Sequence, residues 1–70
     1  MSVFGDRLQK YMIDNDMYPT EVQKLTGVHR TRVNSYIYYG GTPRIEALTK
    51  ICRGLGVSAD YFLGLKEKYS

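Results

Sequence analysis

The sequence predicts an all-α fold built from five short helices. Apolar residues recur at spacings of three and four in several segments, which is the pattern of a helix with one buried face. Glycine, proline and small polar residues separate these segments at short intervals. No part of the sequence shows a convincing alternation of apolar and polar residues, so we expect no strand.

Length and composition indicate one small globular domain. Of the 70 residues, 43% are hydrophobic and 24% are charged, which is an ordinary globular mixture. We expect a single domain over residues 1–70, with a core from about residue 3 to residue 64 and a tail over 65–70. A domain of this size buries only about 60% of its unfolded surface, which leaves little room for an enzyme cleft.

Membrane, secreted and catalytic classes find no support in the sequence. No apolar run approaches the length of a membrane span, and the first ten residues do not follow the pattern of a signal peptide. The single cysteine, Cys52, rules out an internal disulfide, so we expect a cytoplasmic protein. With His29 as the only histidine, we expect no metal, no cofactor, no small-molecule substrate and no enzymatic activity.

The first helix is expected over residues 3–15. Ser2 precedes it and can cap its first turn. Its apolar residues follow helical spacing and are Phe4, Leu8, Tyr11 and Met12. The polar run at 14–16 ends the segment.

The second helix is expected over residues 19–26. Pro19 suits a first helical position and Glu21 suits the first turn. Val22 and Leu25 are predicted to face the core. Gly27 ends the helix, because glycine adopts the left-handed conformation without a Cβ penalty.

The third helix is expected over residues 29–38, before the pair Gly40-Gly41. Its predicted core residues are Val33, Tyr36 and Ile37. A three-residue turn, 27–29, joins it to the second helix, and Val28 is expected to fill the angle between them. Two short helices joined in this way form a helix-turn-helix unit, which needs other helices beneath it for stability.

The fourth helix is expected to begin with Thr42 as its N-cap and Pro43 at its first position, and to end at Gly56. Its predicted apolar stripe consists of Ile45, Leu48, Ile51, Cys52 and Leu55. The fifth helix is expected from Ser58 to Leu63. Gly64 stops it, and the tail that follows is expected to be frayed.

Positive charge is concentrated in the middle of the chain. The formal net charge is +3, and residues 24–53 contain six basic residues but only one acidic residue, Glu46. Residues 1–23 contain two basic and four acidic residues. A basic surface of this kind can bind a polyanion, although the same charges can also be a simple solvated face.

The order of these segments resembles the lambda-repressor-like, or Cro/XRE-type, helix-turn-helix family. The resemblance runs from about Arg7 to Gly64 and is carried by three stretches of sequence. These are LTGVHRTRV at 25–33, PRIEAL at 43–48 and LGVSADYFLG at 55–64. The resemblance implies that helices two and three form the helix-turn-helix and that the third helix enters the major groove of double-stranded DNA.

The resemblance also assigns residues to DNA. The residues that match base-reading positions are Arg30, Thr31, Asn34 and Ser35. Contacts with the phosphate backbone are expected from Thr20, Gln23, His29, Arg32, Tyr38, Tyr39 and Arg44. Arginine can pair with guanine and asparagine with adenine, whereas phosphate contacts mainly fix register. The two tyrosines have an alternative interpretation, in which they pack on the fourth helix.

The function implied is that of a transcriptional regulator, of the phage or mobile-element repressor type, that binds DNA as a homodimer. Family members often pair through the end of helix four, helix five and the tail, which here implicates Val57, Tyr61 and Leu65. The alternative is a protein-interaction module with the same fold, such as an antitoxin.

The sequence departs from the family pattern at the contact between helices two and three and beneath helix three. Gln23 stands where alanine is usual, so its side chain is expected to bend outward, to reach a phosphate or to widen the angle between the helices. Met12 and Ile37 stand where many members place an internal Arg–Glu pair. Because both positions are apolar here, we predict that these two side chains touch.

Overall fold

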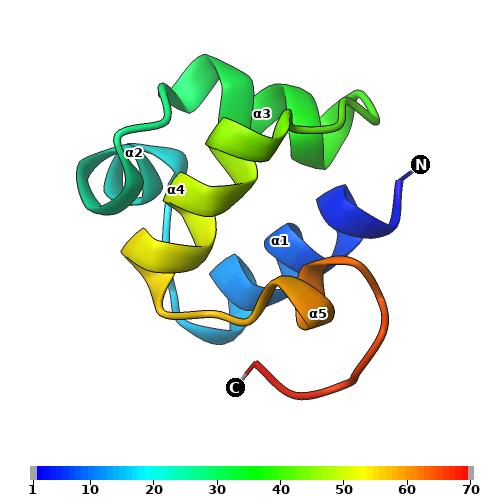
Figure 1. The fold of residues 1–70 in the computed structure, drawn as a ribbon. Coiled ribbons are helices and arrows are strands. Elements are labelled where there is room, and N and C mark those ends of the chain that lie inside the picture. Colours follow the sequence, from blue (N-terminus) through cyan, green and yellow to red (C-terminus); the bar gives the residue numbers. More distant parts are fainter. Residues whose placement is uncertain (1, 70) are drawn as a thin grey trace.

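The computed structural model describes residues 2–69, which contain five helices (Figure 1). In chain order they are α1 (Val3–Asp14), α2 (Pro19–Thr26), α3 (Arg30–Tyr38), α4 (Ile45–Leu55) and α5 (Ala59–Phe62). No strand occurs within residues 2–69, and the predicted all-α class is confirmed. Met1 and Ser70, the ends of the expected domain, lie outside the described residues. Within that range, no helix combines the length and the apolar character that crossing a bilayer requires.

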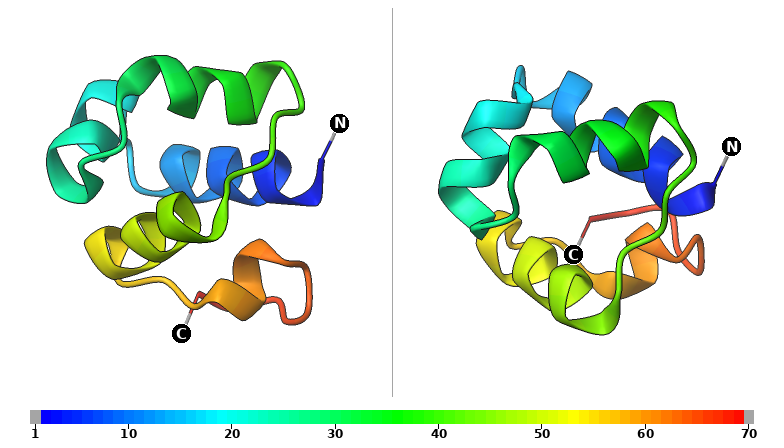
Figure 2. Two further views of the ribbon diagram at one scale, coloured as in Figure 1. Left: turned by 45° about the horizontal axis from the view of Figure 1, so that its top comes forward. Right: turned by 90° about the horizontal axis from the view of Figure 1, so that it is seen from above.

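The helix-turn-helix pair rests on the other helices. α3 packs against α1 and α2, while α2 packs against α4. α5 contacts both α1 and α4. Figure 2 shows that α2 lies at one side of the molecule, whereas α5 and the start of α1 lie at the other. The polar side of α3 is therefore left without a helix above it.

α1 begins as the sequence predicts. The Ser2 hydroxyl accepts a hydrogen bond from the amide of Gly5 at 3.0 Å and so caps the first turn. Phe4, Leu8 and Met12 are buried, while Tyr11 is partly buried against them. The last helical residue is Asp14, one residue before the expected end.

α2 and the turn after it also match the prediction. The helix spans Pro19–Thr26, and Gly27 ends it with φ at 79°. The carboxylate of Glu21 accepts from the amide of Tyr18 at 2.9 Å, which supplies the cap that the Tyr18 side chain does not form. Val28 is buried in the turn, where it contributes to the same core as Val22 and Val33.

The orientation of α2 differs from the prediction at one residue. Leu25 was expected in the core but is 53% exposed, and Thr26 is buried in its place. The reason is the close approach of Gly54 on α4, where an added Cβ would lie 2.4 Å from the Leu25 carbonyl oxygen and 2.7 Å from the Thr26 Cα. Only glycine fits there, so α4 covers the side of α2 that carries Thr26 and leaves Leu25 in solvent.

α4 begins later than the sequence predicts. Thr42 and Pro43 do not start the helix. Residues 40–44 have no regular secondary structure, and Arg44 occupies the N-cap position without a side-chain hydrogen bond. The amide of Gly41 donates to the Ser35 carbonyl oxygen at 3.2 Å, which keeps this connection beside α3. Ile45 was expected in the apolar stripe but is 78% exposed in the first turn.

The tail is ordered against the helices, so the expectation that it would be frayed is wrong for the described residues 65–69. The Tyr69 ring lies edge-on to Tyr11 and Tyr61, with ring centroids 5.0 and 4.9 Å apart. The Tyr69 hydroxyl donates to the Asp14 carboxylate. The backbone carbonyl oxygen of Tyr69 accepts from the Ser58 amide at 2.6 Å. The tail therefore forms a strap over α1 and the start of α5.

The core joins residues from all five helices. Its buried members include Val33, Tyr36 and Ile37 of α3, as predicted. Met12 and Ile37 both belong to this core, and their helices pack against each other. Direct contact between those two side chains stays a prediction.

Candidate nucleic-acid interface

The start of α3 is held by two side chains that were expected to bind phosphate. The Nδ1 atom of His29 accepts from the Thr31 amide at 3.2 Å, so His29 is the N-cap of the helix. The Oε1 atom of Gln23 accepts from the Arg30 amide at 3.0 Å and links α2 to α3. Each interaction satisfies an amide that the first turn leaves unpaired. This hydrogen bond uses the Oε1 atom of Gln23, so the NH2 group of the same carboxamide can donate to another acceptor.

The four predicted base-reading residues lie along the part of α3 that does not face the core. Arg30 and Thr31 are exposed at the start of the helix, where the recognition helix of this motif meets base edges. Asn34 is half-buried one turn later. Ser35 is also half-buried because the connection to α4 passes close to it, and a Cβ added at Gly41 would lie 2.8 Å from its hydroxyl oxygen.

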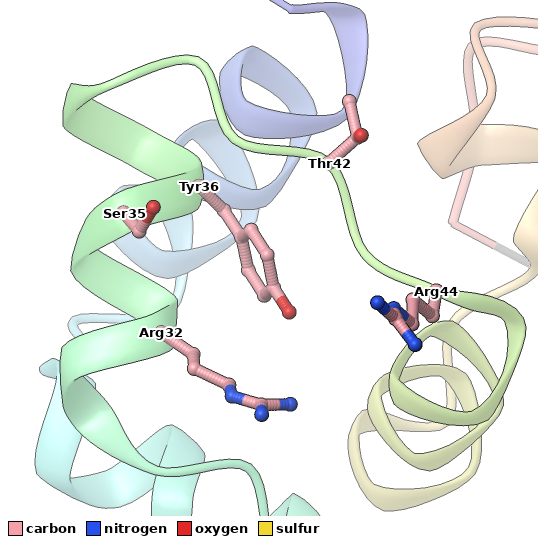
Figure 3. Close-up of a pocket in the computed structure, with 5 residues that line it drawn as sticks. All are labelled: Arg32, Ser35, Tyr36, Thr42 and Arg44. Atoms are coloured by element: carbon pink, nitrogen blue, oxygen red, sulfur yellow. The ribbon is translucent and has the colours of Figure 1, made fainter.

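A polar hollow of about 560 Å³ separates α3 from the start of α4. It is lined by Arg32, Ser35, Tyr36, Thr42 and Arg44. Figure 3 shows the guanidinium groups of Arg32 and Arg44 turned into the hollow from opposite sides, with the Tyr36 hydroxyl between them. The lining contains two cations, three hydroxyl groups and no carboxylate, so its chemistry suits an anion such as phosphate.

A second hollow of about 320 Å³ lies beside the turn before α3. Its charged and titratable lining residues are His29, Arg32, Lys50 and Glu46. Arg32 lines both hollows, so the basic surface continues from the loop after α3 to the turn before it. Lys50, an exposed residue of α4, also belongs to this surface, although the family resemblance did not assign it to DNA.

The remaining predicted phosphate contacts are all exposed. Tyr38 and Tyr39 stand at the end of α3, and neither is buried against α4. Thr20 is exposed in the first turn of α2. The alternative interpretation of the two tyrosines as packing residues is therefore wrong.

Charge pairing distinguishes this surface from the rest of the protein. Among residues 2–69, two ion pairs form, and both use cations of α1. Arg7 binds Glu67 at 2.8 Å and Lys10 binds Asp14 at 3.1 Å. Neither pair involves Arg32, Arg44 or Lys50, so the basic residues around the hollows are available to an external anion.

Two functional groups could not be found from helical periodicity alone. Tyr36 was assigned to the core, and its ring does pack edge-on against Phe4 at 5.3 Å. Its hydroxyl nevertheless lines the hollow, because a tyrosine can bury its ring and keep its oxygen at the surface. Thr42 was expected to cap α4 and instead lines the same hollow. For Tyr36, the available signal in the sequence was its position one helical turn after Arg32, which places both residues on the same side of α3.

Two of the three predicted dimer residues are unavailable to a second copy. Val57 is 4% exposed and Tyr61 is 0% exposed, because both side chains belong to the core. Assigning these side chains to an interface was therefore wrong for this conformation. Leu65 is 73% exposed, and Val3 and Leu63 are exposed near the same end of the molecule. Val3 lies close to Gly64, because a Cβ added at Gly64 would be 2.9 Å from the Cγ1 atom of Val3.

Comparison with known protein families matches residues 7–67 to the Cro/C1-type HTH DNA-binding domain. This range includes most of α1 and all of the other four helices. No curated protein and no solved structure matches the chain. The family resemblance predicted from the sequence, from about residue 7 to residue 64, is thus confirmed. The chain belongs to the Cro/C1-type helix-turn-helix DNA-binding domain family.

Proposed function

We propose that this protein is a sequence-specific transcriptional regulator, of the phage or mobile-element repressor type, that inserts α3 into the major groove of double-stranded DNA. The observation that carries the proposal is the exposed polar side of α3 beside a hollow with two facing guanidinium groups and no acid in its lining. An α-helix fits the major groove, and arginine pairs of this kind suit the flanking phosphates. Family membership supports the DNA-binding part of the proposal.

Base reading is assigned to the first half of α3. Arg30 and Thr31 are exposed at its start, and Asn34 follows on the adjacent turn. Arginine can recognise guanine, asparagine can recognise adenine, and the threonine methyl can contact thymine. Ser35 stands at the border, because its hydroxyl lines the hollow with Arg32 and Arg44. It can serve a base edge or the adjacent phosphate.

Phosphate binding is assigned to both sides of α3. On the side toward α4, the hollow offers Arg32 and Arg44, with Tyr36 and Thr42 as additional donors. The expected set is completed by the exposed His29, Tyr38 and Tyr39 at the two ends of α3, and by Thr20 and the NH2 group of Gln23 on α2. Because such contacts release counterions, binding should weaken steeply as salt increases.

Binding as a homodimer is also part of the proposal. The exposed apolar residues Val3, Leu63 and Leu65 replace the buried pair Val57 and Tyr61 as the expected contact surface. In Figure 2 the start of α1 and α5 lie toward the same side as the end of α3. Two copies paired there would present two α3 helices to two half-sites one helical turn apart.

The test is selection of preferred sites from random double-stranded DNA, followed by affinity measurements on the selected sequence and on an unrelated duplex. Asn34→Ala should reduce discrimination at one base pair by about 1–3 kcal/mol. Arg44→Ala should weaken both duplexes by the same factor and lower the dependence of binding on salt.

The outcomes separate the proposal from its alternative. If no sequence is enriched and the protein fails to bind duplex DNA at low salt, the protein-interaction interpretation, such as an antitoxin, takes precedence. If the two variants behave alike on both duplexes, the division into base-reading and phosphate-binding residues is wrong. Sedimentation with and without the selected DNA tests the homodimer separately.

A further inference from the structure

A second surface of the molecule carries exposed apolar side chains at the corner between α1 and α2. We call these side chains, Ile13, Tyr18 and Leu25, together with the half-buried Met17 between them, the corner patch. Ile13 is 69% exposed, Tyr18 is 73% exposed and Leu25 is 53% exposed. Single exposed apolar residues are common on proteins, but a group that shares one surface marks an interaction site.

The corner patch is continuous because Met17 connects its two halves. One hollow, of about 220 Å³, is lined by Met12, Ile13, Asp16, Met17 and Tyr18. A second, of about 280 Å³, is lined by Met17, Glu21, Lys24 and Leu25. Met17 lies between the two hollows, and its flexible thioether side chain can adapt to an incoming apolar group. Two hollows on either side of one methionine can receive two apolar side chains of the same ligand.

The corner patch is separate from the DNA-facing surface. At 100° per residue, Tyr18, Glu21 and Leu25 share one flank of α2, whereas Gln23 lies on the other. Gln23 is the residue that bonds to the start of α3, so the patch lies on the flank turned away from α3. In Figure 2, α2 and the C-terminal end of α1 lie on one side of the molecule, whereas α5 and the N-terminal end of α1 lie on the other.

The charges at the corner patch restrict what can bind there. Asp16 lines the first hollow and Glu21 lines the second, with Lys24 as the one base. A nucleic-acid backbone would meet a net negative surface. A second copy placed by two-fold symmetry would set the same net negative charge against itself, which is unfavourable. A ligand with basic groups is complementary to this surface.

We propose that the corner patch binds a partner protein through a basic amphipathic helix, whose apolar side chains enter the two hollows and whose lysine or arginine side chains meet Asp16 and Glu21. Helices that place an apolar face into a groove are a common form of peptide recognition. Because the patch lies away from α3, the partner and DNA can bind at the same time. This surface is independent of the DNA-binding proposal and of the dimer surface at Val3, Leu63 and Leu65.

The probe for this surface is a synthetic amphipathic helical peptide with leucines on one face and lysines along both edges. It is titrated into the ¹⁵N-labelled full chain, and amide chemical shifts are followed. We expect saturable changes at residues 12–18 and at residues 21, 24 and 25, and none along the exposed side of α3. Leu25→Ser and Ile13→Ser should each lower the affinity for the peptide about tenfold, which corresponds to about 1.4 kcal/mol.

Matched controls make the result specific. Ile45→Ser removes an apolar side chain of α4 that is even more exposed, at 78%, and should leave peptide affinity unchanged. A peptide with glutamates in place of the lysines should bind far more weakly. The proposal is overturned if the lysine peptide does not bind, if both peptides bind equally, or if the changes spread to Val3, Ile45 and Leu65. DNA affinity of Leu25→Ser should equal that of the wild type, so failure here is distinguishable from failure of DNA binding.

Discussion

Arg7 on α1 and Arg32 on α3 carry the same guanidinium group in opposite surroundings. Arg7 donates to the Glu67 carboxylate at 2.8 Å and to the Lys66 carbonyl oxygen at 3.2 Å, and it lies 4.9 Å from the centre of the Tyr61 ring. Arg32 faces Arg44 across a hollow whose lining contains no carboxylate. The hydrogen bond with Glu67 raises the pKa of Arg7, and the same contact lowers the pKa of Glu67.

This difference separates a cation that holds the fold from one that is available to a ligand. Arg7 connects α1 to the strap, residues 65–69, and its charge is already balanced within the chain. Arg32 and Arg44 place like charges on opposite sides of a hollow, an arrangement that an anion between them would stabilise. Whether a cation has an internal partner thus says more about its availability to a ligand than its position on the surface does.

The largest expected effect is on DNA affinity when both unpaired arginines are removed. Arg32→Ala combined with Arg44→Ala should weaken binding about 100-fold, because each lost charge-assisted contact contributes about 1.5 kcal/mol or more. The slope of log affinity against log salt should also fall by about 1.8. Fluorescence anisotropy with labelled duplex at several salt concentrations measures both quantities. An unchanged slope would show that the two arginines do not neutralise phosphates.

The matched change on the other side of the comparison is Arg7→Ala. It removes the contacts with Glu67, Lys66 and the Tyr61 ring. The melting temperature should fall by about 5 °C, while DNA affinity and its salt slope keep their wild-type values. Circular dichroism and anisotropy measure the two effects. If Arg7→Ala weakens DNA binding as strongly as the double variant, the distinction between structural and ligand-binding cations fails.

A smaller effect is expected for Tyr69→Phe, which keeps the ring in the aromatic cluster and removes the hydroxyl. The melting temperature at neutral pH should fall by about 2–3 °C. Hydrogen-exchange protection of the Ser58 amide, which donates to the Tyr69 carbonyl oxygen, reports whether the strap remains in place. DNA affinity should not change, because the strap lies on the opposite side of the core from the α3 surface.

The pH dependence of the same variant sharpens this test. The hydrogen bond from Tyr69, followed by that from Lys10, lowers the pKa of Asp14, while the carboxylate raises the pKa of Tyr69 to about 12. The stabilisation linked to Asp14 is complete above the ordinary aspartate pKa and is lost as pH falls through the lower folded-state value. The stabilisation linked to Tyr69 is present below about pH 10 and is lost as pH rises toward 12. Wild type and Tyr69→Phe should therefore differ most at neutral pH and converge at both extremes.

Local signals predicted the helices well where one residue type decides the backbone. α2 spans Pro19–Thr26 as predicted, because Pro19 favours a first helical position and Gly27 adopts the left-handed conformation that ends the helix. Ser2 and Ser58 cap their helices for the same local reason. The start of α4 was predicted less well, since Thr42 belongs to an irregular connection that stays beside α3 and the helix begins only at Ile45.

The candidate interface was predicted in part. The family pattern placed Arg30, Thr31 and Asn34 on the surface of α3, which is where the structure has them. It could not identify Tyr36 or Lys50 as lining residues, because their roles depend on how α3 and α4 approach each other. Gln23 was recognised as unusual, but its hydrogen bond to the Arg30 amide required the relative positions of two helices.

By itself, the sequence determined the five-helix class, the helix-turn-helix with its three-residue turn, and the concentration of positive charge between residues 24 and 53. These properties follow from short-range backbone preferences and from composition. Tertiary structure alone decided that Leu25 and Ile45 face solvent, that the tail packs onto Tyr11 and Tyr61, and that Arg32 and Arg44 face each other. The physical reason is that each of these outcomes depends on contacts between segments far apart in the chain, such as the close approach of Gly54 to α2.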